Sequence, residues 1–361
     1  MLAVVRAIAC GLVALVVVAA QEPADSLADR IATLLRATQK PNAPGAVVLV
    51  QRGDKVLHER GHGMADLERA IALHPGSVLD IGSTSKQFTA ASVLLLEQDR
   101  VLALADPVAK HVKEVPACCA KVTLRHLLLH TSGIPDYIGL MMRGDAPHHI
   151  EDRTTADDAL HALAEVPELD FAAGSKWAYS NSNYFLLATV VERASGTPLT
   201  EFAKKRIFEP LGMTKTHIHT DCTQLVPDRA FSYSRARSGG WRWNFSNWEQ
   251  SGDGAVMTTV GDLAKWARNF GSGVVGGPEL RTAMSKPGAL DDGTALEYGA
   301  GLMFGDLEGT PCISHGGAWA AYRAELLRVP SADLVVVCLC NRDDLEPQAL
   351  CRKIALAVLR G

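Results

Sequence analysis

The sequence predicts an α/β protein of the α+β type, in which strands from both ends of the chain form one antiparallel sheet. Strand-like runs occupy residues 45–60 and 298–341, whereas the segments between them carry mostly helical periodicity. The 361 residues suffice for one large domain with an inserted layer. We therefore expect a single domain over residues 21–361, with an α/β part at about 21–82 and 271–361 and a helical part at about 83–270.

The first 20 residues differ in kind from the rest of the chain. Arg6 is their only charge, and residues 7–20 form an uninterrupted apolar run that ends in small side chains before Gln21. This arrangement is typical of a secretory signal peptide cleaved after Ala20, so we expect a periplasmic or secreted protein. An uncleaved anchor is the alternative, although the run is shorter than the roughly 18 to 20 residues of a membrane span.

After this segment, the apolar spacing predicts each element in turn. Residues 26–37 predict an amphipathic terminal helix, and residues 45–50 and 55–60 predict a hairpin around the turn at 52–54. The predicted helices of the middle region are 84–98, 123–130, 155–164, 181–194, 200–207 and 262–270. The predicted C-terminal elements are strands at 298–304, 309–314, 322–329 and 334–341 and a helix at 346–359.

Composition excludes some classes of function. A net charge of −4 provides no basic surface for nucleic acid. Seven cysteines follow Ala20, and we interpret them mainly as buried small hydrophobic residues. The longest loop, at 227–254, contains Trp241, Trp243, Phe245 and Trp248, which either line a substrate cleft or cap a core.

A hydroxyl and an amine lie three residues apart in Ser83-Thr84-Ser85-Lys86. Positions i and i+3 share one face of a helix, so the two side chains can meet. A serine becomes a nucleophile when a neighbouring base takes its proton, and a desolvated lysine can supply that base.

Two further motifs offer partners for this pair. Tyr179-Ser180-Asn181 places a phenol and an amide at the start of a predicted helix, where the phenol can relay a proton. His315-Gly316-Gly317-Ala318 follows a predicted strand. Its glycines allow close backbone approach, and a backbone N–H there can donate to an oxyanion.

In this order, the three motifs resemble those of the penicillin-binding-protein-like serine hydrolases, in the class C β-lactamase-related branch. The pattern of that family is S-x-x-K, then Y-x-N, then K-T-G or H-x-G. Other matching segments are 102–107, 124–135, 208–213, 322–330 and Asn341, so the resemblance runs from about residue 28 to the end. It implies a β-lactamase/transpeptidase-like fold.

The resemblance also implies a role for each motif residue. Ser83 attacks an acyl carbon, and Lys86 and Tyr179 share the proton transfers. Asn181 holds Lys86 and the amide of the substrate, and His315 orients the substrate. The backbone N–H groups of Ser83 and Ala318 form the oxyanion hole, and Gly317 is expected among the residues that bind the substrate or its oxyanion. The family needs no metal or organic cofactor for this chemistry.

One departure from the family pattern narrows the expected function. Class C β-lactamases carry lysine where His315 stands, and histidine is charged only part of the time at neutral pH. We therefore expect a weaker hold on a substrate carboxylate, and a hydrolase of the esterase or D-amino-acid peptidase type acting on a small ester or peptide. A β-lactamase or DD-peptidase acting on β-lactams or cell-wall peptides is the alternative. An acylated sensor without turnover is the second alternative.

Rival motifs point to other chemistry. His217-Ile218-His219-Thr220-Asp221-Cys222 partly matches the H-x-H-x-D-H zinc motif but lacks its last histidine. No G-x-S-x-G of an α/β-hydrolase occurs. Residues 130–133 are interpreted as a helix end with Gly133. Asp253 between two glycines either shapes the floor of a cleft or, as the simpler interpretation, lies in a turn.

Overall fold

The computed structural model describes residues 27–38, 40, 42–143 and 148–361. The predicted signal peptide at residues 1–20 lies outside the described residues. Among the helices that are described, none is both long and apolar enough to cross a membrane.

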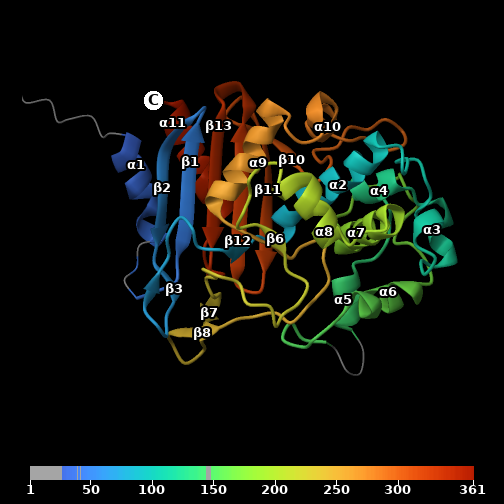
Figure 1. Ribbon diagram of the computed structural model, residues 1–361, viewed down its shortest axis with the longest axis horizontal. Coiled ribbons are helices and arrows are strands. Elements are labelled where there is room, and N and C mark those ends of the chain that lie inside the picture. The colour runs from blue at the N-terminus through green and yellow to red at the C-terminus, as the bar shows by residue number, and fades with distance from the viewer. Residues whose placement is uncertain (1–26, 39, 41, 144–147) are drawn as a thin grey trace, which may run out of the picture.

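Six antiparallel strands form the central sheet, in the order β10-β11-β12-β13-β1-β2. Their bounds are β1 (Ala46–Arg52), β2 (Lys55–His62), β10 (Met303–Leu307), β11 (Thr310–Trp319), β12 (Tyr322–Val329) and β13 (Leu334–Cys340). Strand β1 pairs with β13 along its whole length, from Ala46 opposite Cys340 to Arg52 opposite Leu334. Figure 1 shows the blue N-terminal strands beside the red C-terminal ones. The predicted fold class is confirmed.

Both faces of the sheet are covered, which explains the continuous apolar run of β1. Successive side chains of a strand point to opposite faces. Val48 and Val50 join the core beneath the terminal helices α1 (Leu27–Leu34) and α11 (Pro347–Leu359). Val47 and Leu49 join the larger core on the other face, where α9 (Val260–Ser272) contacts β1 and β13.

The helical part is built around α2 (Lys86–Gln98), which is buried from Lys86 to Leu96. It packs on α7 (Asn181–Ser195), α8 (Leu199–Ala203) and α10 (Gly277–Met284), so the start of α2 lies where this part meets the sheet (Figure 1). The remaining helices are α3 (Val108–His111), α4 (Leu124–Leu128), α5 (Tyr137–Met141) and α6 (Ala156–Ala164). Short helical turns are η1 (Leu35–Thr38), η2 (Gly82–Ser85), η3 (Ala117–Lys121), η4 (Lys204–Phe208) and η5 (Pro330–Ala332).

The structure differs from the sequence prediction in its small strands. These are β3 (Met64–Asp66), β4 (Ile71–Ala72), β5 (Leu79–Asp80), β6 (His217–Ile218), β7 (Tyr233–Arg235), β8 (Trp241–Trp243) and β9 (Val256–Thr258). Two or three residues are too few to display an alternating pattern, so periodicity could not reveal them. The predicted loop at 227–254 therefore contains a hairpin, β7–β8.

The strand predicted to end at residue 314 instead continues through the glycines to Trp319. Gly316 and Gly317 pair with Glu325 and Ala324 of β12, so the His-Gly-Gly motif lies inside the sheet and not in a turn. The cysteines agree better with prediction: five of the seven are buried, and Cys118 and Cys222 are half-buried.

Candidate functional site

Ser83 lies in the turn η2, directly ahead of α2 and against strand β11. Gly82 has φ +48°, and a Cβ there would lie 2.6 Å from the Ala318 nitrogen. A Cβ on Gly317 would lie 1.8 Å from the carbonyl oxygen of Ile81. Only glycine fits at these two positions, because backbone packs directly on backbone. The serine is thereby held beside the backbone of Ala318.

Lys86 is fully buried, and its ammonium nitrogen has three oxygen neighbours. Nζ lies 3.0 Å from Ser83 Oγ, 2.8 Å from Asn181 Oδ1 and 2.7 Å from the carbonyl oxygen of Asp253. An ammonium has three hydrogens, so the three contacts use all of them. A neutral amine would keep donating to the amide and carbonyl oxygens and would present its lone pair to the serine hydroxyl. The same geometry therefore suits both protonation states.

Asn181 is oriented by Asp136, a residue that the sequence analysis did not single out. The backbone N–H and the side-chain Nδ2 of Asn181 both donate to Asp136 Oδ2, at 2.7 and 2.9 Å. The amide oxygen of Asn181 is thus left to face Lys86. One hydrogen of its NH₂ group is engaged by Asp136, so only the other is available to a substrate.

Tyr179 borders this cluster, and its ring packs on a second buried ring. It stacks on His130 with centroids 4.3 Å apart, and Lys86 Nζ lies 4.9 Å from the Tyr179 centroid. The Tyr179 hydroxyl is buried, with no hydrogen-bond partner in the part of the chain that is described. Burial lowers the pKa of His130 well below its ordinary value, so the stacked imidazole is neutral. The phenol can therefore accept or donate a proton without breaking an existing hydrogen bond.

His315 differs from the expectation that it orients the substrate and is partly charged. It is 2% exposed, and burial, reinforced by Lys86, lowers its pKa to about 4. Its Nδ1 lies 2.7 Å from the carbonyl oxygen of Gly316, which can only accept, so Nδ1 carries the proton. Nε2 then accepts from the Tyr298 hydroxyl at 3.2 Å. The imidazole is neutral at pH 7, and its ring does not line the cavity described next.

A cavity of about 270 Å³ opens beside the serine. Of the residues expected to form the site, Ser83, Asn181 and Ala318 line it, whereas Lys86, Tyr179, His315 and Gly317 do not. Further lining residues include Asp80, His219, Arg229, Trp248, Asp253 and Tyr322. The cavity is large enough for a small-molecule acyl group and places it against Ser83.

Two buried carboxyl groups line this cavity. Burial raises the pKa of Asp80 and of Asp253 to about 6. Asp80 Oδ1 accepts from the Gly82 backbone N–H at 2.7 Å, and Asp253 Oδ2 accepts from the Tyr137 hydroxyl at 3.2 Å. Asp253 therefore lies in the site, which agrees with the expectation that it shapes the cleft floor and not with the simpler interpretation as a turn alone.

The aromatic residues of the loop at 227–254 do not all have the same role, either lining a cleft or capping a core. Trp248 lines the cavity and packs edge-on against Trp319 at 5.4 Å. Trp241 instead lies under the guanidinium groups of Arg235 and Arg342, and Trp243 is half-exposed. One of the loop's tryptophans is thus part of the cleft.

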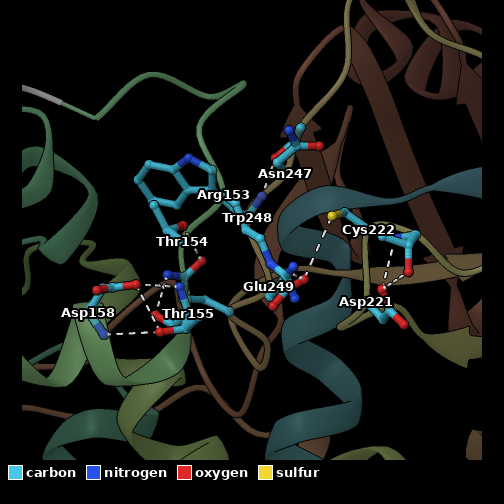
Figure 2. Close-up of polar contacts among 12 residues, drawn as sticks. Arg153, Thr154, Thr155, Asp158, Asp221, Cys222, Asn247, Trp248 and Glu249 are labelled. Carbon is cyan, nitrogen blue, oxygen red and sulfur yellow. Dashed lines mark hydrogen bonds and ion pairs between the residues drawn. The ribbon is translucent and has the colours of Figure 1, made fainter.

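The wall that carries Trp248 is tied to the start of α6 (Figure 2). Thr154 N–H donates to the carbonyl oxygen of Asn247 at 3.3 Å, and Glu249 N–H donates to that of Thr154 at 2.9 Å. Arg153 forms an ion pair with Glu249 at 3.2 Å, and Cys222 Sγ lies 3.7 Å from the same carboxylate. Figure 2 shows how these contacts join three segments that are distant in sequence.

The zinc hypothesis for His217 and His219 is not supported by their positions. Within the described ranges, the one group with ligand atoms close enough to share an ion is Asp221, Cys222 and Glu249, all within 4.8 Å. Neither histidine belongs to it. Arg153 already occupies the carboxylate of Glu249, and burial raises the pKa of the Cys222 thiol, which disfavours the thiolate that a metal needs.

Comparisons with known proteins point in one direction. The family model described as Beta-lactamase matches residues 27–359. Penicillin-binding protein 4* of Bacillus subtilis is 28% identical over 91% of this chain and 75% of its own length. A D-aminopeptidase of Gluconobacter oxydans is 28% identical over 87% of this chain, which spans only 59% of that protein. The octameric penicillin-binding protein homologue from Pyrococcus abyssi superposes with a TM-score of 0.77 at 25% identity, over 93% of this chain and 77% of that one.

Proposed function

Because this chain belongs to the beta-lactamase family and is a serine hydrolase of that family, we propose that it cleaves a small ester or amide through a covalent acyl-enzyme on Ser83. The observation that carries this proposal is the position of Lys86 Nζ, 3.0 Å from Ser83 Oγ and fixed by Asn181 and the Asp253 carbonyl. A base held in this way can take the serine proton without moving.

Acylation begins with neutral Lys86, whose lone pair faces the serine hydroxyl. The proton passes from Oγ to Nζ as Oγ attacks the carbonyl carbon and the carbonyl electrons move onto oxygen. The backbone N–H groups of Ser83 and Ala318 donate to this oxyanion, and each such donor contributes about 10²–10³ in rate. The tetrahedral intermediate collapses and expels the alcohol or amine, which receives the proton through the Tyr179 hydroxyl.

Deacylation uses the same groups, with water in place of the serine as the nucleophile. A water molecule attacks the ester of Ser83, and the same lysine–tyrosine pair removes its proton. The second tetrahedral intermediate then collapses, the bond between its carbon and Oγ breaks, and the lysine–tyrosine pair returns the proton to Oγ. The acid and the free serine are released. Atoms and charges balance without a metal or organic cofactor.

The D-aminopeptidase relative supports an ester or D-amino-acid amide over a β-lactam as the substrate. A panel of chromogenic esters, D-amino-acid amides and a cephalosporin, assayed with wild type and Ser83→Ala, tests this choice. We expect turnover of an ester or amide that is lost in Ser83→Ala. Rapid turnover of the cephalosporin would favour the β-lactamase alternative. Labelling of Ser83 without release of any acid would favour the sensor alternative.

We further propose export, on the evidence of the apolar segment at residues 7–20. Expression of the full sequence in a bacterial host should yield a periplasmic protein that begins at Gln21, as N-terminal sequencing would show. A membrane-bound product that still begins at Met1 would instead indicate an uncleaved anchor.

A further inference from the structure

We propose that Arg229 binds a carboxylate of the substrate, so that the enzyme prefers esters or amides bearing a carboxylate close to the scissile carbonyl. This inference rests on the acyl hydrolysis proposed above. Arg229 lines the same cavity as Ser83. Among the described residues that line the cavity, it is the only arginine or lysine.

Arg229 lies close enough to Asp80 to offset part of the rise in the Asp80 pKa that burial causes, but the two groups form no ion pair. The neighbour of Arg229 in sequence, Asp228, pairs with Lys215 at 2.7 Å. In the part of the chain that is described, no carboxylate forms an ion pair with Arg229, and its buried Nε has no hydrogen-bond partner. A partly buried guanidinium without a counter-ion favours a ligand of opposite charge, and its planar fork matches a carboxylate.

The other basic groups near Ser83 cannot take this role. Lys86 Nζ is directed at Ser83 Oγ, Asn181 Oδ1 and the Asp253 carbonyl oxygen, and Lys86 does not line the cavity. Burial, with a contribution from Arg229, lowers the pKa of His219 to about 4. His315 is likewise neutral and does not line the cavity. Neutral His315 thus stands where class C β-lactamases carry lysine. The cation that lines the cavity is Arg229, which comes from a different segment of the chain.

The backbone fixes Arg229 relative to the serine. Val78 N–H donates to the carbonyl oxygen of Asp228 at 2.9 Å, and Ala230 N–H donates to that of Val78 at 3.0 Å. Val78 directly precedes β5, which leads into the Ser83 turn. The Tyr322 hydroxyl of β12 donates to the Ala230 carbonyl at 2.7 Å, tying the same segment to the sheet.

At its other end, the segment that carries Arg229 is braced by the contacts in Figure 2. Cys222 lies against Glu249, and Glu249 pairs with Arg153. Arg229 therefore projects from a segment that is held at both ends, which favours a defined distance between guanidinium and nucleophile.

Asp80 and Asp253 line the same cavity and define the rival proposal, because carboxylates would select an ammonium group in the substrate. Each is already engaged by a protein donor, the Gly82 N–H and the Tyr137 hydroxyl respectively. The guanidinium acts on Asp80 through space but forms no ion pair with a carboxylate of the described residues. The observations therefore favour an anionic substrate.

Two matched pairs of esters test this proposal. The first is the p-nitrophenyl hemiester of glutaric acid and its methyl-capped neutral analogue; the second is m-carboxyphenyl acetate and phenyl acetate. The pairs place the carboxylate on the acyl side or on the leaving-group side. The readout is the ratio of kcat/KM for the anionic ester to that for its neutral partner. Wild type, Arg229→Gln, Arg229→Lys and the exposed control Arg237→Gln are compared.

We expect Arg229→Gln to lower this ratio by about tenfold to a hundredfold for at least one pair, which is the usual effect of a hydrogen bond to a charged group. The loss should appear mainly in KM, Arg229→Lys should retain part of the preference, and Arg237→Gln should match wild type. An unchanged ratio in Arg229→Gln would overturn the proposal. So would a preference for an ester with an ammonium group that disappears in Asp80→Asn.

A binding measurement tests the carboxylate site independently of the proposed hydrolysis. Calorimetric titration of the two glutarate esters into Ser83→Ala and into Ser83→Ala/Arg229→Gln requires no turnover. Tighter binding of the anionic ester that is lost with the arginine supports the carboxylate site, even if wild type hydrolyses neither ester. Equal binding of both esters by Ser83→Ala would refute the site, even if wild type hydrolyses both.

Discussion

The side-chain amide of Asn181 donates to the carboxylate of Asp136 at 2.9 Å, and this contact turns its oxygen toward Lys86. A flipped amide would place hydrogens against the hydrogens of the ammonium. Asp136 therefore orients Asn181, which in turn orients Lys86, although Asp136 itself does not line the cavity.

Replacing Asp136 by alanine should lower kcat by about tenfold to a hundredfold, because Lys86 would lose a fixed acceptor. The change also removes the N-cap of α5, where Asp136 Oδ1 accepts from the Ile138 N–H, and should cost about 1 kcal/mol of stability. Steady-state kinetics and urea unfolding measure the two effects. Asp157→Ala, which removes an exposed acid in the first turn of α6, is the control and should change neither much. Full activity in Asp136→Ala would show that Asn181 needs no such support.

Replacing Gly317 by alanine should separate the Ser83 turn from β11. The added Cβ would lie 1.8 Å from the Ile81 carbonyl oxygen, so the backbone must shift and displace the Ala318 N–H. We expect kcat to fall by about a hundredfold or more, the effect of losing an oxyanion donor. Gly139→Ala is the matched control, since a Cβ there meets nothing within 4 Å. Wild-type turnover by Gly317→Ala would contradict the placement of the oxyanion hole at Ala318.

Glu325 supplies a test of stability against pH away from the serine. It is 3% exposed, its Oε2 has no hydrogen-bond partner among the described residues, and burial raises its pKa to about 7. The folded protein therefore binds a proton that the unfolded chain releases near pH 4.5, so stability is lost as the pH rises from about 4.5 to 7.

Glu325→Gln removes this penalty. It should raise the free energy of unfolding at pH 8 by up to about 3 kcal/mol and leave it nearly unchanged at pH 4. Urea unfolding at the two pH values measures the difference. If the gain were the same at both, ionisation of Glu325 would not be its cause.

His315→Lys distinguishes a buried support from a substrate-binding group. The imidazole lies between the Tyr298 hydroxyl and the Gly316 carbonyl, so a lysine would bring a charge into a site that favours a neutral ring. We expect a loss of about 2 kcal/mol or more in unfolding free energy and no gain in the kcat/KM ratio for anionic esters. His315→Gln is the neutral comparison. A stable His315→Lys protein with a stronger preference for anionic esters would show that the side chain at position 315 binds the substrate.

The sequence predicts the sheet and the nucleophile–base pair because each depends on the spacing of residues that are close together in the chain. Long apolar runs determine β1 and β13, and helical spacing brings Ser83 and Lys86 together. The contact of Asp136 with Asn181 joins residues 45 positions apart, and only the folded loops reveal it. Arg229 has no motif around it, so its place beside Ser83 depends on the bridge between its segment and Val78.

His315 shows a different limit of sequence reasoning. The His-Gly-Gly motif is visible in the sequence. The charge of the imidazole and the orientation of its ring, however, depend on burial and on a contact with Tyr298, which belongs to none of the three motifs. Asp253 is similar: flanking glycines suggested a turn, whereas its carbonyl oxygen accepts from Lys86 and its carboxylate accepts from Tyr137.

The most direct test of the account is the identity of the residue that is acylated. Wild type, Ser83→Ala and the neighbouring Ser85→Ala are each treated with a fluorophosphonate serine probe and then analysed by intact and peptide mass spectrometry. We predict one added phosphonyl group per chain on Ser83 in wild type and in Ser85→Ala, and none in Ser83→Ala. Undiminished labelling of Ser83→Ala, or a label on any other residue of wild type, would contradict the assignment of Ser83 as the nucleophile.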